Sequence, residues 1–235
     1  MRQNPAAVPP LSRAMLASAN FEATVAGETP VQRTLSNEER TRSLEDTMRL
    51  RPEGPLWVFA YGSLIWNPVL HYEERRDATL SGWHRAFCLT TRAGRGAPDR
   101  PGLVLALDEG GRCDGIAYRL AEEDLALELA MLWRREMLFG SYVPRWVTLK
   151  DRSGNGLATA LTFVANRTID RYEPRIDRAT AIHRLATARG SLGSSAQYLF
   201  QTRDALLECG ILDDELEALA ADVEVYRGRF PDLCN

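Results

Sequence analysis

The sequence has very little lysine and histidine, and its cysteines form no recognised motif. Among 29 basic residues only Lys150 is a lysine, so the other 28 are arginines, and three histidines are scattered along the 235 residues. Neither a His-Glu-x-x-His motif nor a Cys-x-x-Cys pair occurs, which argues against a zinc site. The four cysteines have no framework spacing, so we expect reduced thiols in a chain of this length.

Long hydrophobic runs and an excess of positive charge are also missing. No apolar stretch approaches the roughly 18–20 residues that cross a bilayer, and no apolar segment follows Arg2 as in a secretory signal. With a formal net charge of −3, the chain lacks the basic surface that attracts nucleic acids and anionic membranes. We therefore expect a cytoplasmic protein that binds neither nucleic acid nor membrane. The sequence leaves the oligomeric state open.

The N-terminal part of the chain has no sustained periodicity before Ser36. Ser36 with Glu39 fits a capping box, which predicts a short helix to about residue 50. A Pro- and Gly-rich break at 51–55 follows. We therefore expect three segments, namely a flexible leader with one short helix, one folded domain and a C-terminal tail, over residues 1–55, 56–228 and 229–235.

Strands precede helices in the expected folded domain. A nearly all-apolar strand covers 56–60, and a second runs from about 78 to 91. Turn residues predict two hairpins, across Asp108–Gly111 and across Ser153–Gly156. Helices are expected over 121–139 and, separated by glycines, near 178–189, 194–208 and 213–227. This order of elements is typical of an α+β domain.

One glutamate lies on the apolar face of the helix expected over 121–139. At 100° per residue, Glu136 falls about 20° from Leu125, between Leu129 at about 40° and Leu132 at about −20°. Arg135 falls on the outer face. Burial of a carboxylate is costly unless it is paired, and desolvation raises its pKa into the range useful for proton transfer. The alternative is a structural glutamate bonded to a buried arginine or a backbone amide.

Three loops are further candidates. Residues 61–64 follow a buried strand, and a Gly-Ser turn there can direct N–H groups at an anion, although a plain turn is the alternative. The basic loop 92–102 suits a carboxylate-binding lid or a solvated connector. Residues 190–193 match the GxxG clamp of some RNA-binding modules but lack basic surroundings, so a break between helices is the simpler interpretation.

A set of short motifs occurs in a fixed order over about residues 56–226. The motifs are Trp57–Pro68, Gly82–Phe87, Arg95–Gly96, Pro101–Leu103, Gly111–Cys113, Gly115–Tyr118, Arg135–Met137, Tyr142–Val147, Gly190–Gly193 and Tyr198–Leu199. Together they resemble the ChaC-type, glutathione-specific γ-glutamylcyclotransferases. The resemblance covers nearly the whole expected domain and leaves out the leader.

The resemblance implies a compact mixed β-sheet or barrel with flanking helices. It also implies an enzyme that cleaves glutathione to 5-oxoproline and cysteinylglycine without metal or organic cofactor. The family's catalytic glutamate corresponds to Glu136. Substrate binding is expected at Tyr61, Gly62, Ser63, Leu64, Arg95 and Tyr142. Candidates for the glycyl carboxylate of glutathione are Arg85, Arg95 and Arg100.

The implied reaction is an internal aminolysis, in which the substrate's α-amine attacks its own γ-carbonyl. Such a reaction needs no side-chain nucleophile, in agreement with the missing Ser/His/Asp and Cys/His arrangements. Glu136 is expected to take a proton from the α-ammonium and return one to the leaving nitrogen. Amides near residues 62–64 are expected to hold the α-carboxylate or the oxyanion. The alternatives are a cyclotransferase for other γ-glutamyl amines or amino acids, and a non-catalytic regulatory binding protein.

Overall fold

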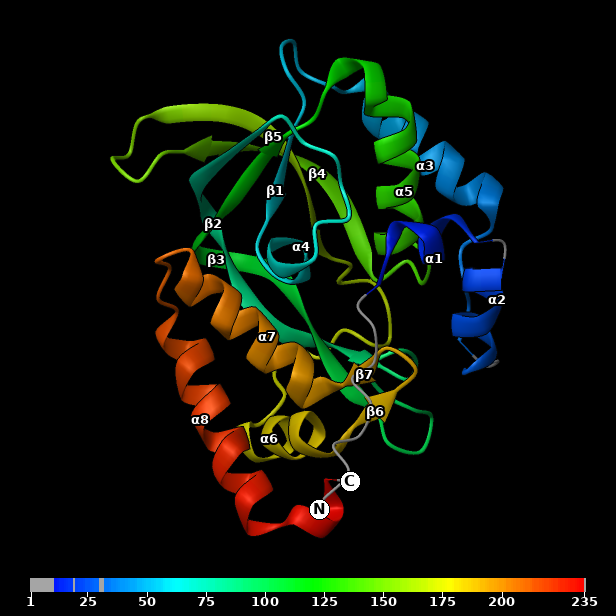
Figure 1. Ribbon diagram of the computed structural model, residues 1–235, viewed down its shortest axis with the longest axis vertical. Helices are drawn as coiled ribbons and strands as arrows, with labels where there is room; N and C mark the ends of the chain where they lie inside the picture. The colour runs from blue at the N-terminus through cyan, green and yellow to red at the C-terminus, as the bar shows by residue number, and fades with distance from the viewer. Residues whose placement is uncertain (1–10, 19, 30–31, 235) are drawn as a thin grey trace.

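The computed structural model describes residues 11–18, 20–29 and 32–234, and a closed five-stranded barrel lies at its centre (Figure 1). Around the barrel the strands follow the order β1-β3-β2-β4-β5, and β1 closes it by pairing in parallel with β5. The other successive pairs are antiparallel. The strands are β1 (Trp57–Ala60), β2 (Glu74–Thr91), β3 (Gly102–Arg119), β4 (Tyr142–Lys150) and β5 (Gly156–Ala165).

Helices flank the barrel in two groups (Figure 1). One group contains α1, α2, α3 and α5, and the other contains α6, α7 and α8. Their bounds, with α4 and a small strand pair, are α1 (Arg13–Ala17), α2 (Asn20–Gly27), α3 (Asn37–Arg49), α4 (Ser63–Trp66), α5 (Leu125–Glu136), α6 (Arg178–Thr187), β6 (Arg189–Gly190), β7 (Gly193–Ser194), α7 (Ser195–Glu208) and α8 (Asp214–Arg229). Short 3-10 turns cover Glu122–Asp124 and Pro231–Leu233.

The structure confirms the predicted class, an α+β protein with a mixed barrel and flanking helices. All four residues of β1 are buried, which explains why this strand has no polar alternation. Helix α5 packs Leu125, Leu129 and Leu132 into the same core, and its Trp133 ring meets Phe163 of β5 edge-on at 5.3 Å between centroids. Within the described part of the chain, no helix is both long and apolar enough to cross a membrane.

The hairpin expected across Asp108–Gly111 is wrong, whereas the hairpin joining β4 and β5 is confirmed. Strand β3 continues through the Gly-Gly pair as one strand of 18 residues along β2. Gly110 and Gly111 have φ of 102° and 70°, and the register shifts opposite them at Gly82. The glycines therefore form a bulge that bends the strand without reversing it.

The leader holds more structure than the one expected helix. Helix α3 begins with the predicted capping box, but α1 and α2 precede it and bury apolar side chains beside Met131 of α5. Arg13 of α1 donates two hydrogen bonds of 2.7 Å to the carboxylate of Glu128, which is fully buried on α5. Helices this short gain most of their stability from such packing, so their own sequence carries little signal. Residues 1–10 of the expected leader lie outside the described residues.

Candidate active site

A cavity of about 180 Å³ and a smaller inner recess of about 20 Å³ share part of their lining. The residues common to both are Ser63, Glu136, Tyr142 and Tyr198. The structure thus brings together the predicted catalytic glutamate and the six predicted substrate-binding residues, because the cavity or the recess is lined by Tyr61, Gly62, Ser63, Leu64, Arg95, Glu136 and Tyr142.

The segment after β1 forms a short helix and not a plain turn. Helix α4 begins at Ser63, directly after the N-cap residue Gly62, and Gly62 O accepts from the Ile65 N–H at 2.8 Å. The first amides of a helix find no carbonyl partner within it, so this position suits an anionic group. A Cβ on Gly62 would lie 3.3 Å from a methyl group of Leu105 and 3.4 Å from the Tyr198 hydroxyl. A side chain at Gly62 would therefore narrow the recess.

Glu136 is the last residue of α5 and exposes only 13% of its side chain. Its Oε1 lies 2.9 Å from Nε of Arg135, whose Nη2 also donates to Ser63 Oγ at 2.9 Å. The prediction that Arg135 faces outward is wrong, since only 6% of its side chain is exposed. The helical-wheel prediction assumes that only one face of α5 is packed. At the C-terminus of α5, Ser63 of α4 and Asn67, which follows α4, contact Arg135 and cover a second face.

Burial controls the protonation of the site. Desolvation raises the pKa of Glu136, and the nearby Arg135 guanidinium only partly opposes this effect. Burial also raises the pKa of Tyr61 and Tyr142 well above the usual value, and that of Tyr198 to about 12. These phenols are therefore neutral at physiological pH. Among them and the cavity arginines, Glu136 is the group suited to exchange a proton near neutral pH.

Arg95 reaches the cavity from the loop between β2 and β3. Its guanidinium lies 5.7 Å from the centroid of the Tyr198 ring, and its hydrogen bonds to Ser194 O and Gln197 Oε1 are long, at 3.4 Å. Burial lowers its pKa to about 10, so the side chain stays cationic. Arg95 is therefore a half-buried cation that is weakly held by its protein partners.

The strand pair β6–β7 supports the Arg95 loop. The Leu192 N–H donates to Gly94 O at 2.8 Å, and a Cβ on Gly190 would lie 2.6 Å from the carbonyl oxygens of Gly94 and Gly96. Residues 190–193 do separate two helices, as expected. They also contact the loop so closely that only glycine fits at position 190.

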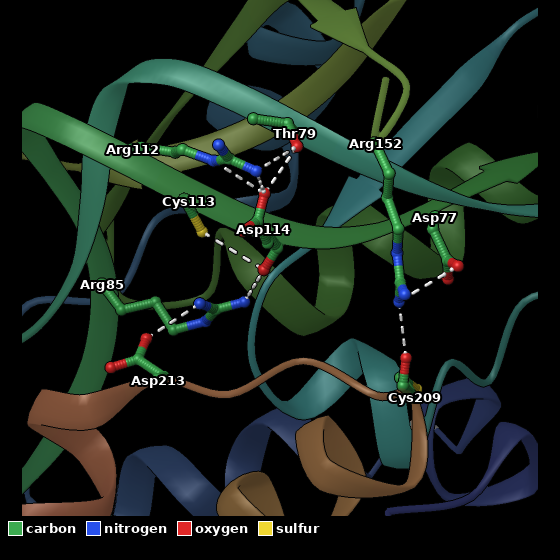
Figure 2. Close-up of polar contacts among 9 residues, drawn as sticks. All are labelled: Asp77, Thr79, Arg85, Arg112, Cys113, Asp114, Arg152, Cys209 and Asp213. Carbon is green, nitrogen blue, oxygen red and sulfur yellow. Dashed lines mark hydrogen bonds and ion pairs between the residues drawn. The ribbon is translucent and has the colours of Figure 1, made fainter. Parts of the chain in front are cut away.

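Two of the three arginines considered for the glycyl carboxylate lie away from the cavity. Figure 2 shows Arg85 directed at Asp213 and the Asp114 carbonyl; its Nη1 pairs with Asp213 at 2.9 Å. Its Nε donates to Tyr61 O at 2.6 Å, so Arg85 holds the backbone of a site residue without lining the cavity itself. Arg100 lines a separate pocket with His183. Arg135 and Arg171, which sequence reasoning did not select for the site, line the cavity instead.

No cysteine of the described residues lines the cavity or the inner recess. The predicted reduced cysteines are confirmed as free thiols at Cys88, Cys113, Cys209 and Cys234. Burial raises the pKa of the Cys88 and Cys113 thiols to about 12, so neither is a thiolate at neutral pH. Across residues 11–18, 20–29 and 32–234, no cluster of three His, Cys, Asp or Glu side chains is placed to hold a metal ion.

Comparisons with known proteins agree with the sequence motifs. A family model described as ChaC-like protein matches residues 56–226. A glutathione-specific γ-glutamylcyclotransferase from Escherichia coli K12 is 45% identical over 199 residues, which cover 84% of this chain and 86% of that protein. The human glutathione-specific γ-glutamylcyclotransferase 1 is 33% identical over 184 residues, or 76% and 82% of the two chains.

The fold also has a close counterpart among solved structures. A yeast γ-glutamyl cyclotransferase specific to glutathione superimposes with a TM-score of 0.68, covering 74% of this chain and 97% of the yeast chain. The sequence identity is 21%, so this likeness concerns the fold.

Proposed function

The chain belongs to the ChaC-like family, and from this premise we propose that it is a glutathione-specific γ-glutamylcyclotransferase. It cleaves glutathione to 5-oxoproline and cysteinylglycine. The observation that carries the proposal is the buried carboxyl group of Glu136, with its raised pKa, in a cavity beside the α4 N-terminus. The 45% identity to a relative named for this activity supports the same conclusion.

The reaction rearranges bonds within the substrate. The α-nitrogen of the γ-glutamyl group forms a bond to the γ-carbon, and the bond from that carbon to the cysteinyl nitrogen breaks. Glu136 takes a proton from the α-ammonium and returns it to the leaving nitrogen. The second proton that the α-nitrogen loses when the lactam forms ends on the amine of cysteinylglycine, so the enzyme ends unchanged. Orientation of such an intramolecular attack is worth about 7–11 kcal/mol when the reacting conformer is enforced. The narrow recess supports the view that this protein enforces it.

The predicted binding residues have separable roles in this proposal. Amides at Gly62, Ser63 and Leu64 hold the α-carboxylate or the developing oxyanion. Tyr61 and Tyr142 form walls, since their hydroxyls already donate to the carbonyls of Phe163 and Leu105 at 2.7 and 3.0 Å.

Arg95 supplies a positive charge for a substrate carboxylate, because its own hydrogen bonds are long. The substrate in this proposal is a small anionic tripeptide. Free thiols at all four cysteines fit a reducing compartment, and we include a cytoplasmic location in the proposal.

The proposal is tested by incubating the purified protein with glutathione and separating the products. Equal amounts of 5-oxoproline and cysteinylglycine are expected. γ-Glutamyl-alanine serves as the comparison substrate, since it retains the γ-glutamyl group and lacks the cysteinylglycine half. Release of 5-oxoproline from γ-glutamyl-alanine but not from glutathione would contradict the glutathione assignment, and release from neither would contradict the enzyme assignment.

A further inference from the structure

The cavity is lined by a second arginine, Arg171, that forms no ion pair with any described residue. Arg171 is 7% exposed, and its Nη1 and Nη2 donate to Ser141 Oγ at 3.0 Å and Phe139 O at 2.8 Å. None of the ion pairs among the described residues involves Arg171. Burial lowers its pKa, and the carboxylate of the neighbouring Asp170 opposes this effect only in part. A buried guanidinium without a counter-ion is costly. Two of its five N–H donors are used, so three remain for a ligand.

Shared lining residues place Arg171 at the end of the cavity away from the inner recess. A larger pocket of about 730 Å³, here called the outer pocket, shares Arg171 and Phe139 with the cavity. Glu136 and Ser63 line the cavity and the inner recess, and neither lines the outer pocket. The cavity therefore lies between the recess and the outer pocket, with Glu136 on the inner side and Arg171 on the outer side.

This order matches the chemistry of the proposed substrate. When the γ-carbonyl of glutathione lies at Glu136, the cysteinylglycine part extends outward by two residues, or about 7 Å at 3.3–3.6 Å per residue. It ends in a carboxylate. We propose that Arg171 binds this glycyl carboxylate with its remaining donors and thereby selects substrates that carry it; the assignment rests on the proposed function. A planar guanidinium is suited to bind a carboxylate bidentately.

Arg95 is then left for the carboxylate at the other end of glutathione. Its guanidinium lies against Tyr198, which lines the inner recess as well as the cavity. The two cavity arginines without acidic partners thus correspond to the two carboxylates of the substrate.

A purely structural role is the competing explanation for Arg171. Its bonds to Phe139 and Ser141 secure the turn that joins α5 to β4, and this turn connects Glu136 with Tyr142. Loosening the turn would impair every substrate equally. Loss of a carboxylate contact would impair only substrates that have the carboxylate.

The experiment compares glutathione with its glycinamide analogue, in which an amide replaces the glycyl carboxylate. For the wild-type protein we expect kcat/KM to be about 10- to 100-fold lower with the analogue, mainly through KM, as for loss of a charge-assisted contact. Arg171→Met is expected to lose a similar factor with glutathione and nothing further with the analogue. Arg171→Lys should recover part of the loss. Arg178→Met, at an exposed arginine paired with Asp222, is the control.

Several outcomes would overturn the assignment. One is an equal KM of the wild-type protein for glutathione and the analogue, which is decisive even where Arg171→Met fails to fold. Another is an equal loss of Arg171→Met activity with both substrates. Failure of the wild-type protein to release 5-oxoproline from either substrate would contradict the proposed function itself, and the assignment of Arg171 with it.

Discussion

The guanidinium of Arg135 pairs with the carboxylate of Glu136, its neighbour in the chain, at 2.9 Å between Nε and Oε1. Adjacent residues on a helix do not normally face each other. They meet here because α5 ends at Glu136 and its last turn is enclosed by the cavity and by α4. The same guanidinium reaches Ser63, so it links the carboxyl group to the N-terminus of α4, which is proposed to bind the substrate. The pKa of Glu136 nevertheless stays raised, because burial outweighs the pairing.

Replacement of Glu136 by glutamine tests the proposed proton transfer. Glutamine keeps the shape of the side chain but removes the base, so turnover should fall by about 10²- to 10⁴-fold, the usual contribution of general acid–base catalysis. The measurement is the rate of 5-oxoproline release at saturating glutathione. Glu123→Gln, at an exposed position just before the same helix, should leave the rate unchanged. Near wild-type turnover by Glu136→Gln would exclude Glu136 as the catalytic base.

The raised pKa of Glu136 predicts the acid side of the pH profile. The base must be ionised, so kcat falls as the pH drops through the raised pKa, and this fall occurs at higher pH than the ordinary value of about 4.3 for glutamate. Arg135 lowers the pKa, so Arg135→Met should move the fall to still higher pH. Steady-state rates over a pH series test both statements. A midpoint at or below the ordinary value, or a shift to lower pH in Arg135→Met, would contradict them.

The parts of the fold that sequence predicted are those determined by neighbouring residues. The strand ending at Ala60 and the hairpin at Ser153–Gly156 have their apolar pattern and turn residues in one short stretch. The error at Gly110–Gly111 has a non-local cause, because a Gly-Gly pair signals a turn locally while pairing along β2 keeps the chain extended. Helix α1 escaped prediction since its Arg13 finds its partner 115 residues away.

The residues of the candidate site also divide into those that the sequence identifies and those that only the fold brings together. Glu136 could be selected because its place on the apolar face and the Arg-Glu motif pointed to the same residue. Arg171 could not, since it lies in no recognised motif and its contacts with Phe139 and Ser141 depend on the fold. Arg85 was selected as a possible ligand for the substrate, yet its ion pair with Asp213 directs it away from the cavity. Proximity between distant segments decided the cases of Arg171 and Arg85.

The ion pair between Arg13 and Glu128 predicts that the leader stabilises the domain. Burial alone would raise the pKa of Glu128, but hydrogen bonds from Arg13 and the His71 N–H outweigh it and the pKa is lowered. A lowered folded-state pKa contributes stability above the unfolded-state value, and this contribution is lost as the pH falls through the folded-state value. Arg13→Ala should therefore reduce the free energy of unfolding by about 1.5–3 kcal/mol at neutral pH.

Urea denaturation at neutral and acidic pH measures this effect. The difference between Arg13→Ala and wild type should shrink in acid, where Glu128 is protonated in both. Arg178→Ala removes an exposed pair with Asp222 and should cost no more than about 1 kcal/mol. Equal stability of Arg13→Ala and wild type at neutral pH would show that the leader does not stabilise the domain through this pair.

Gly190 predicts a separate effect on the Arg95 loop. A methyl group at position 190 would meet the carbonyl oxygens of Gly94 and Gly96 at 2.6 Å, so Gly190→Ala must displace either the β6–β7 pair or the loop. Because Arg95 lies in that loop, we expect KM for glutathione to rise and the free energy of unfolding to fall by about 1–3 kcal/mol, as in overpacked sites.

Gly228→Ala on helix α8 is the matched control, since a Cβ at that position has no neighbour within 4 Å. That variant should stabilise the helix by up to about 1 kcal/mol and leave KM unchanged. An unchanged KM in Gly190→Ala would show that the contact between β6–β7 and the loop does not position Arg95 for the substrate.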